Sequence, residues 1–500
     1  MRLIDVLKGD PTLQDMDVTI GQMDIAGLTC DSRDVRPGFL FAALPSAGSS
    51  ARAGSQSVDG RDFIEAATAN GAVAVLAPLG TADDARFIVP IIEDANVRLR
   101  FAHMAAKYYA RQPGTVAAIT GTNGKTSAAS FLRQIWQRLG QKAASIGTLG
   151  VHGNGFDEPG TLTTPDPVKL HKTLARLARG GIECVAMEAS SHGLSQYRLD
   201  AVKVMAAGFT NITRDHLDYH ATMKDYLAAK MRLFSEVVDE AGYAVINADS
   251  PEGREVAAVA RKRGLSVLTF GRDGQDIRVL EQRPHVDGQT LVLQVSGKAY
   301  SVALPLAGGF QMENALCALG LALALGADTV KAIEALKTLQ GVPGRLQKVG
   351  NLGSASVYVD YAHTPDALQN VLAALRPHAV GRLHVMFGCG GDRDAGKRSQ
   401  MGAIAAKFAD NVIVTDDNPR TENAAAIRAE ILSACPGAIE IADRHTAILT
   451  AVKALSDGDV LVLAGKGHEQ GQIVGDQVLV FDDVQEAKAA IELAQEEAGA

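Results

Sequence analysis

Residues 116–126, which read VAAITGTNGKT, constrain the fold more than any other stretch of the chain. A run of small apolar residues, typical of a buried parallel strand, leads directly into a glycine-rich turn. The turn ends in Lys125 and Thr126 and is followed by a helical segment, SAASFLRQIWQRLG. Backbone N–H groups in such a turn bind phosphate oxygens, the lysine adds a positive charge, and the hydroxyl can ligate Mg²⁺.

This turn is a variant of the P-loop. A standard P-loop has glycine where this chain has Ile119, and the glycines here are Gly121 and Gly124. A Gly-Lys-Thr tripeptide by itself is most often an ordinary loop. The strand before it and the helix after it favour nucleotide phosphate binding.

Composition limits the class of protein. A chain of 500 residues predicts several domains, and 47% apolar residues with 50 glycines suit an α/β protein. No apolar run approaches the roughly 18 residues that span a bilayer, and the N-terminus lacks a signal peptide's apolar segment, so we expect a cytoplasmic protein without membrane insertion. A net charge of −8 disfavours nucleic acid as a partner.

The five cysteines are far apart and form no CxxC pair, which argues against a zinc site and against a disulfide framework. We expect them to be reduced thiols.

Strand and helix patterns predict three α/β domains, at residues 1–112, 113–338 and 339–500. In the first, the runs 28–35, 38–44, 72–78 and 87–92 read as short strands. The second alternates strands and helices as in a doubly wound parallel sheet, and an antiparallel patch is predicted over 277–306. The third repeats the alternation and is predicted to be a Rossmann-like domain.

Polar clusters follow the predicted strands of the second and third domains. They are residues 122–127, 188–192, 210–220, 360–366, 390–398, 416–420 and 465–469. Ligands of open α/β sheets bind at the carboxyl ends of strands, so we expect these clusters to form one site between domains.

Three features of the second domain suggest chemistry. Glu188 can cap a helix, pair with a cation or ligate Mg²⁺, and the nearby phosphate loop favours the metal. The stretch 211–220 is too dense in Asn, Asp and His for an ordinary loop. Lys230 is either an ordinary solvated lysine of a helix or one whose apolar helical neighbours bury its stem and desolvate its amine.

Arginines on glycine- or proline-shaped loops of the third domain resemble carboxylate and phosphate clamps. Arg345, Arg393 and Arg420 could each be a surface charge, but guanidinium groups bind both anions bidentately. Together with Asn418 and Glu469 they would suit a ligand that carries carboxylate and ammonium groups, namely an amino acid.

The motifs TGTNGKTS, TTPDP, MEASSHGL, FTNITRDHLDYH, AAKMRLF, PGRLQ, DYAHTPDAL, GCGGDRDAGKR, DDNPR and GKGHE occur in the order found in the Mur ligases. The chain resembles this family over essentially its whole length. The resemblance implies an N-terminal uridine-nucleotide domain, a central ATP-binding domain and a C-terminal amino-acid-binding domain. It also implies small-molecule substrates, and we expect a monomer.

The resemblance also implies roles for individual residues. ATP would contact Gly121, Thr122, Asn123, Gly124, Lys125, Thr126, Ser127, Asn314, Arg345, Asp360 and His363. Mg²⁺ would be held by Thr126, Glu188, His216 and Lys230, the last as an N-carbamate (N6-carboxylysine); Lys125, Lys230 and His216 would be catalytic. The UDP-linked substrate would contact Ser32, Gln56, Ser57, Thr163, Thr164, Ser190, Gln196 and Arg198. The incoming amino acid would contact Arg393, Asp417, Asn418, Pro419, Arg420, Gly465 and Glu469.

The activity implied is an ATP-dependent ligase that adds meso-2,6-diaminopimelate to the D-glutamate of UDP-N-acetylmuramoyl-L-alanyl-D-glutamate through an acyl phosphate, in peptidoglycan precursor synthesis. In this family DNPR accompanies diaminopimelate, and Arg420 would pair with its distal carboxylate but repel a distal ammonium. Gln311 and Arg61 depart from the usual Asn and His. The alternatives are a ligase like folylpolyglutamate synthase and a nucleotide-dependent switch without ligase activity.

Overall fold

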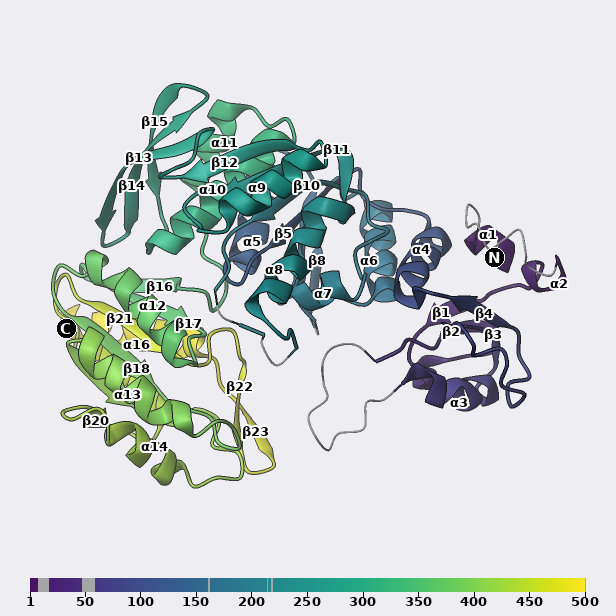
Figure 1. Ribbon diagram of the computed structural model, residues 1–500. Helices are drawn as coiled ribbons and strands as arrows, with labels where there is room; N and C mark the ends of the chain where they lie inside the picture. The colour runs from purple at the N-terminus through teal and green to yellow at the C-terminus, as the bar shows by residue number, and fades with distance from the viewer. Residues whose placement is uncertain (8–17, 47–58, 161, 214, 217–218, 500) are drawn as a thin grey trace. The chain divides into compact units, whose positions relative to one another are not determined.

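The computed structural model describes residues 1–7, 18–46, 59–160, 162–213, 215–216 and 219–499. Figure 1 shows its helices and strands along the chain. The chain divides into two compact units. Unit 1 comprises Met1–Asp276 and Cys317–Ala332, and unit 2 comprises Ile277–Leu316 and Ile333–Ala500. The boundaries predicted near residues 112 and 338 stay predictions. The α/β class with parallel-dominated sheets is confirmed.

Unit 1 begins with a small parallel sheet of order β1-β2-β3-β4. Its strands are β1 (Gly27–Thr29), β2 (Phe39–Ala42), β3 (Ala72–Pro78) and β4 (Ile91–Asp94), and its helices are α1 (Leu3–Val6), α2 (Val18–Gly21), η2 (Ser32–Asp34), η3 (Gly60–Phe63), α3 (Ile64–Ala69) and α4 (Val97–Tyr109). Phe101 of α4 packs with Leu40 and Leu76 on one face. Ile64 of α3 packs with Val75 on the other.

Two predicted strands of this sheet are only partly correct. The run 87–92 joins the sheet only at Ile91, where β4 begins. The run 28–35 leaves the strand after Thr29 and turns into the helix η2. Asp31 causes the change, because its side chain accepts a hydrogen bond from the backbone N–H of Arg33 and so caps that helix.

The central sheet of unit 1 has the order β12-β11-β10-β5-β9-β6-β7-β8. Its strands are β5 (Thr115–Thr120), β6 (Ala143–Gly147), β7 (Gly150–Gly153), β8 (Phe156–Pro159), β9 (Cys184–Glu188), β10 (Val204–Phe209), β11 (Val238–Asn247) and β12 (Ser266–Gly271). The helices are α5 (Lys125–Arg138), α6 (Pro167–Arg179), α7 (Ser191–Ser195), α8 (Met223–Arg232), η4 (Leu233–Val237), α9 (Gly253–Lys262), α10 (Gly309–Ala324) and α11 (Thr329–Leu336), of which α10 and α11 cross the division between units. Within this sheet the six strands β12, β11, β10, β5, β9 and β6 are parallel to one another. Strands β7 and β8 follow β6 and are antiparallel to their neighbours.

The two faces of this sheet are covered by different helices. Leu174 of α6 and Val256 of α9 share one core with Val185 of β9. On the other face α10 lies so close that a side chain on Gly208 would stand 2.8 Å from the sulfur of Cys317. The sheet is therefore doubly wound, as predicted.

A buried histidine between α4 and α6 makes unit 1 sensitive to acid. His171 is buried on α6, and burial, helped by the positive charge of His103, lowers its pKa from 6.5 to about 4. In the unfolded chain this imidazole takes up a proton near pH 6.5, whereas in the folded chain it stays neutral until about pH 4. We expect folding stability to fall by about 3 kcal/mol as the pH drops through this window. Urea unfolding at pH 7 and pH 4.5 measures the loss.

The control for this pH dependence is a pair of variants. His171→Leu should remove most of the acid-dependent loss of stability, because leucine does not titrate in either the folded or the unfolded chain. His445→Gln, at a histidine whose side chain is 61% exposed, should retain it. An unchanged pH slope in His171→Leu would refute the assignment.

Unit 2 contains an antiparallel meander and a second open sheet. The meander is β13 (Ile277–His285), β14 (Gly288–Val295) and β15 (Lys298–Leu304), as predicted. The sheet has the order β16-β17-β21-β18-β19-β20, from β16 (Gln347–Leu352), β17 (Ala355–Asp360), β18 (Leu383–Phe387), β19 (Asn411–Val414), β20 (Ile439–Glu440) and β21 (Val460–Ala464). All its neighbouring strands are parallel except β16 and β17.

Helices cover both faces of this second sheet. They are α12 (Pro365–Leu375), η5 (Arg376–His378), α13 (Gly396–Phe408), α14 (Ala424–Leu432), α15 (Arg444–Lys453) and α16 (Asp483–Gly499). Leu372 of α12 and Ile431 of α14 pack with Phe387 on one face. Ile448 of α15 and Ala490 of α16 belong to the core on the other. The Rossmann-like arrangement is as predicted.

Three hairpins were not predicted: β7 with β8, β16 with β17, and β22 (Gly471–Val474) with β23 (Gln477–Val480). In β23 the side chains of Val478 and Val480 are largely exposed, so the strand lacks the buried face on which periodicity depends.

Across the described residues, none of the helices combines the length and the apolar character needed to cross a bilayer.

Candidate active site

The phosphate loop follows β5, the strand that lies between β9 and β10. Ile119 is still inside β5 and fully buried, with Gly208 opposite it in the register. This explains the variant motif, because the residue at this position packs in the core and the turn begins only at Gly121. Gly121 has φ +152°, and a Cβ there would collide with the hydroxyl of Thr210. Gly124 has φ +86° and caps α5, so both glycines are required by the backbone.

The segment after β10 forms hydrogen bonds with this loop. The hydroxyl of Thr210 donates to the carbonyl of Asn123 at 2.6 Å, and the Asn211 side chain accepts from the Asn123 N–H at 3.0 Å. Thr122 N–H donates to the Asn211 carbonyl at 2.8 Å, and its hydroxyl lies 3.1 Å from the hydroxyl of Tyr226. The polar cluster predicted at 210–220 therefore begins by holding the loop in shape.

Two lysines converge on one carbonyl of this loop. Lys125 Nζ donates to the carbonyls of Gly121 at 2.9 Å and Thr122 at 2.8 Å. Lys230 Nζ, from α8, donates to the same Gly121 carbonyl at 2.8 Å and lies 4.4 Å from the centre of the Tyr226 ring. Lys230 is 1% exposed, and burial, together with the charge of Lys125, places the pKa of its amine well below the usual value. The expectation of a buried, desolvated amine agrees with this structure.

Glu188 ends β9, next to β5 in the sheet, with its carboxylate buried. One oxygen accepts from the Thr148 N–H at 2.8 Å and the other from the Thr148 hydroxyl at 3.2 Å. Gly147 makes room for the carboxylate, because a Cβ there would collide with it.

His216 lies on the segment after β10, with φ +53°. Its backbone N–H donates to Asp215 at 2.8 Å, and its ring packs 4.8 Å from His192 and 5.9 Å from Tyr226, centre to centre. The ring therefore approaches the same tyrosine that contacts Lys230 and Thr122.

The residues predicted for the UDP-linked substrate gather beside Glu188. Thr164 is the centre of the group: its hydroxyl donates to the Glu188 carbonyl at 2.9 Å and lies 3.1 Å from the hydroxyl of Ser190. Arg198 donates to the Thr164 carbonyl and to the Gln196 side chain, both at 2.7 Å. The Thr163 hydroxyl is 3.0 Å from that of Thr148, which also contacts Glu188.

The remaining residues of that prediction lie in the first sheet. Ser32 begins η2, and its carbonyl accepts from Asn70 at 3.0 Å. Gln56 and Ser57 lie outside the described residues. Arg61, a departure from the family pattern, pairs with Asp59 at 3.0 Å on the surface.

Unit 2 brings together the other residues predicted for ATP. Asp360, at the end of β17, is buried and accepts from the N–H groups of Leu346 at 2.6 Å and Ala362 at 2.8 Å. Burial raises its pKa to about 6. The Arg345 guanidinium lies 5.3 Å from the centre of the Tyr361 ring, which packs 4.6 Å from His363.

Gln311, the second residue that departs from the family pattern, is hydrogen-bonded to residues of this group. Its side chain donates to the Arg345 carbonyl at 2.8 Å and accepts from Asn314 at 3.3 Å. The glutamine thus ties the start of α10 to the loop at 341–346.

Loops at the carboxyl ends of β19 and β21 bring most of the predicted amino-acid pocket together. The Asn418 side-chain nitrogen donates to Glu469 at 3.0 Å. Gly465 has φ +111°, and a Cβ there would stand 2.7 Å from a carboxylate oxygen of Asp417. Arg420 has φ +52° and donates to the Gly391 carbonyl at 2.7 Å. Pro419, between them, lies against the same loop, since a Cβ on Gly391 would collide with its carbonyl.

Arg393 is not brought into this group. Its side chain is exposed and forms no hydrogen bond or ion pair within the described ranges. The arginine held firmly in its loop is Arg398, which is 2% exposed and pairs with Glu422 at 2.8 Å and Glu430 at 3.2 Å.

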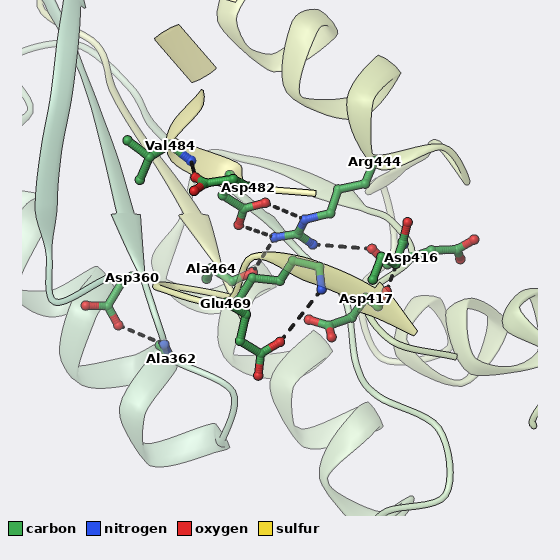
Figure 2. Close-up of polar contacts among 12 residues, drawn as sticks. Asp360, Ala362, Asp416, Asp417, Arg444, Ala464, Glu469, Asp482 and Val484 are labelled. Carbon is green, nitrogen blue, oxygen red and sulfur yellow. Dashed lines mark hydrogen bonds and ion pairs between the residues drawn. The ribbon is translucent and has the colours of Figure 1, made fainter. Parts of the chain in front are cut away.

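A buried ion pair lies beside the loops of the predicted amino-acid pocket, and Figure 2 shows its arginine, Arg444, directed at Asp416 and Ala464. Arg444, at the start of α15, and Asp483, at the start of α16, are both fully buried and pair at 2.6 Å. The same guanidinium donates to the backbone carbonyls of Asp416 at 3.3 Å and Ala464 at 3.1 Å. One side chain therefore fixes the ends of both loops that carry the pocket residues.

Sequence reasoning missed Arg444, Asp483 and Lys466, all of which are fully buried in unit 2. Of these three residues, only Lys466 has a recognisable sequence context: it lies between the two glycines of the GKGHE motif, at the end of an apolar strand. Nothing near Arg444 or Asp483 in the sequence distinguishes them from surface charges.

Comparisons with known proteins agree with this arrangement. The Mur ligase middle domain matches residues 119–322, and the Mur ligase glutamate ligase domain matches residues 344–467. The protein named UDP-N-acetylmuramoyl-L-alanyl-D-glutamate--2,6-diaminopimelate ligase of Caulobacter vibrioides is 52% identical over 94% of this chain and 96% of its own length. The protein of the same name from Bradyrhizobium diazoefficiens is 50% identical over 98% of this chain and 99% of its own.

Among solved structures, one described as UDP-N-acetylmuramoyl-L-alanyl-D-glutamate--2,6-diaminopimelate ligase is 33% identical, with a TM-score of 0.75 over 99% of both chains. The motifs, the two matching domains and these nearly full-length relatives lead to one conclusion: the chain is a member of the Mur ligase family.

Proposed function

We propose that the protein is the ATP-dependent ligase that joins meso-2,6-diaminopimelate to the D-glutamate of UDP-N-acetylmuramoyl-L-alanyl-D-glutamate. The observation that carries the proposal is the pairing of charges in the amino-acid pocket. Glu469 is oriented by Asn418, and Arg420 is held on the adjacent loop, so one group can take an ammonium and the other a carboxylate. Relatives of that name share about half of the sequence over nearly its full length.

The reaction would proceed in two steps. The D-glutamate carboxylate attacks the γ-phosphate of ATP, which forms a P–O bond and releases ADP. The backbone N–H groups of the phosphate loop and the Lys125 ammonium stabilise the transferred phosphoryl oxygens. The amine of diaminopimelate then attacks the acyl carbon, loses a proton and expels phosphate, which leaves an amide.

Lys230 would act as a carbamate in this scheme. Carbamate formation requires a neutral amine, which attacks CO₂, forms an N–C bond and releases one proton. Burial favours the neutral amine at Lys230. The product would be an anion on a nitrogen that lies 2.8 Å from the Gly121 carbonyl, to which the Lys125 ammonium also donates, so it would replace the repulsion between two lysines with attraction.

The residues around the phosphate loop fit Mg²⁺. Glu188 ends the strand next to β5 and holds its carboxylate against Thr148, and Thr126 lies in the first turn of α5. No group of three or more His, Cys, Asp or Glu side chains in the described residues could hold a metal by itself. That suits Mg²⁺, which binds few protein ligands together with substrate phosphates and water. Bound there with His216 and the Lys230 carbamate as further ligands, it would neutralise phosphate charge.

The group around Thr164 would hold the peptidyl part of the UDP-linked substrate, and Ser32 would lie near its uridine. Asn314, Arg345, Asp360 and His363 would contact ATP. A cytoplasmic location and a monomeric state complete the proposal; the five free cysteines support a reducing compartment.

Phosphate release from ATP tests the function. With the UDP-muramoyl dipeptide present, release should require meso-diaminopimelate, and L-lysine should not replace it, because its distal ammonium would face Arg420. Release with lysine but not with diaminopimelate would overturn the substrate assignment. Release only with a folate and glutamate would favour a folylpolyglutamate synthase, and release under no condition would favour a nucleotide-dependent switch.

A further inference from the structure

The loop after β21 contains a buried cation that the proposed chemistry leaves without a role. Lys466 is fully buried, although lysines seldom are. Its Nζ donates to the Asn418 side-chain oxygen at 2.9 Å and to the Gly471 carbonyl at 2.7 Å, and it lies 3.7 Å from a carboxylate oxygen of Glu469. Burial lowers the pKa of Lys466, and the nearby carboxylates of Asp417 and Glu469 offset part of that effect.

These contacts determine which way the Asn418 amide points. Its oxygen accepts from Lys466 Nζ and from the Ile473 N–H, each at 2.9 Å. An ammonium and a backbone N–H can only donate, so the amide oxygen has to face them. The amide nitrogen then has to face the other way, where it donates to Glu469 at 3.0 Å.

The Glu469 carboxylate receives its orientation from this chain of contacts. Asn418 occupies the oxygen Oε2, while Oε1 forms no hydrogen bond with any residue that the structure describes. The Glu469 side chain is about one-third exposed, so a ligand can approach its carboxylate. A carboxylate held through one oxygen presents the other in a fixed direction, which lowers the entropy lost when an ammonium binds.

We propose that Lys466 is a positioning residue for amino-acid binding: it fixes the Asn418 amide, and through it the Glu469 carboxylate that takes an ammonium group of the substrate. The inference rests on the proposed function, since it assigns Glu469 to the amino-acid pocket. Lys466 itself does not touch the substrate. Its effect should therefore be on the KM of one substrate and not on those of the other two.

Lys466→Met tests the inference, because methionine retains most of the buried volume and cannot donate a hydrogen bond. The amide of Asn418 then has one donor on its oxygen in place of two and can rotate away from Glu469. Loss of a hydrogen bond from a charged donor predicts a rise of about 10- to 100-fold in the KM for diaminopimelate. The KM values for ATP and for the UDP-linked substrate should stay within about twofold, and kcat should change less than the KM for diaminopimelate.

Two further variants separate positioning from folding. Lys407→Met, at an exposed lysine of α13, should match the wild type in all parameters. Lys466→Gln can still donate to Asn418 and should give a KM between those of the wild type and Lys466→Met. If Lys466→Met does not fold, as judged by its circular dichroism and melting temperature, Lys466→Gln is compared with the wild type by itself.

The KM values of these variants either support or overturn the positioning role of Lys466. An active Lys466→Met with an unchanged KM for diaminopimelate, or a variant that loses only kcat in proportion to its folded fraction, would overturn the inference and leave the ligase assignment intact. A wild-type chain that releases no phosphate with any substrate set would overturn the proposed function, and the inference with it. A selective rise in KM that Lys466→Gln partly restores would support the inference.

Discussion

Replacing Lys230 with alanine is expected to lower kcat for phosphate release about 100- to 1000-fold, the loss typical when one group that stabilises transferring charge is removed. Lys230 is buried against the Gly121 carbonyl, to which Lys125 also donates, so the alanine variant would leave the Lys125 ammonium without the proposed carbamate anion. The loss should appear in kcat and in kcat/KM alike, because the carbamate would act during phosphoryl transfer. Steady-state phosphate release with all three substrates measures it.

The carbamate makes this prediction specific. A short carboxylate such as acetate or formate should enter the space vacated in Lys230→Ala and restore part of the rate, because it supplies the missing anion. The matched control is Lys224→Ala, at an exposed lysine of the same helix, which should retain full activity and show no response to acetate. Full activity of Lys230→Ala without any added carboxylate would refute the carbamate.

Periodicity explains how much of the fold could be predicted. β5, β9, β10 and β21 are continuous apolar runs because parallel strands covered on both faces have no polar side, and their bounds lie within one or two residues of the predicted runs. The same rule located the polar clusters at strand ends. Short or exposed elements were not predicted correctly: β23 has no buried face, and the strand predicted over 28–35 ends early because Asp31 caps η2.

The site could be predicted only in part, for a different physical reason. Residues within one motif, such as Lys125 and Gly121, meet because the turn brings them together. Contacts between distant motifs depend on how loops pack, and no local pattern encodes them. Lys466 meets Asn418, which is 48 positions away, and Arg444 meets Asp483, which is 39 positions away. The clearest prior sign of such pairs is a charged residue within an apolar neighbourhood.

Arg444→Met is expected to destabilise unit 2 by about 3–5 kcal/mol, the usual result of removing one partner from a buried ion pair. Asp483 would be left fully buried without a counter-ion, and the carbonyls of Asp416 and Ala464 would lose the donor they share. For a unit of this size the loss corresponds to a fall of about 10 °C in melting temperature. Calorimetry or denaturant unfolding monitored in unit 2 measures it.

The double replacement Arg444→Met with Asp483→Leu distinguishes pairing from packing. Because no buried charge then remains, it should be more stable than either single variant, so the two effects should be strongly non-additive. The matched control is Lys453→Met, which breaks the surface pair of Lys453 with Glu497, where both side chains are more than one-third exposed, and should cost less than about 1 kcal/mol. Additive single effects would show that Arg444 and Asp483 stabilise the unit separately. In the double variant the loops after β19 and β21 would still lack their shared donor, so the KM for diaminopimelate should stay raised even where stability returns.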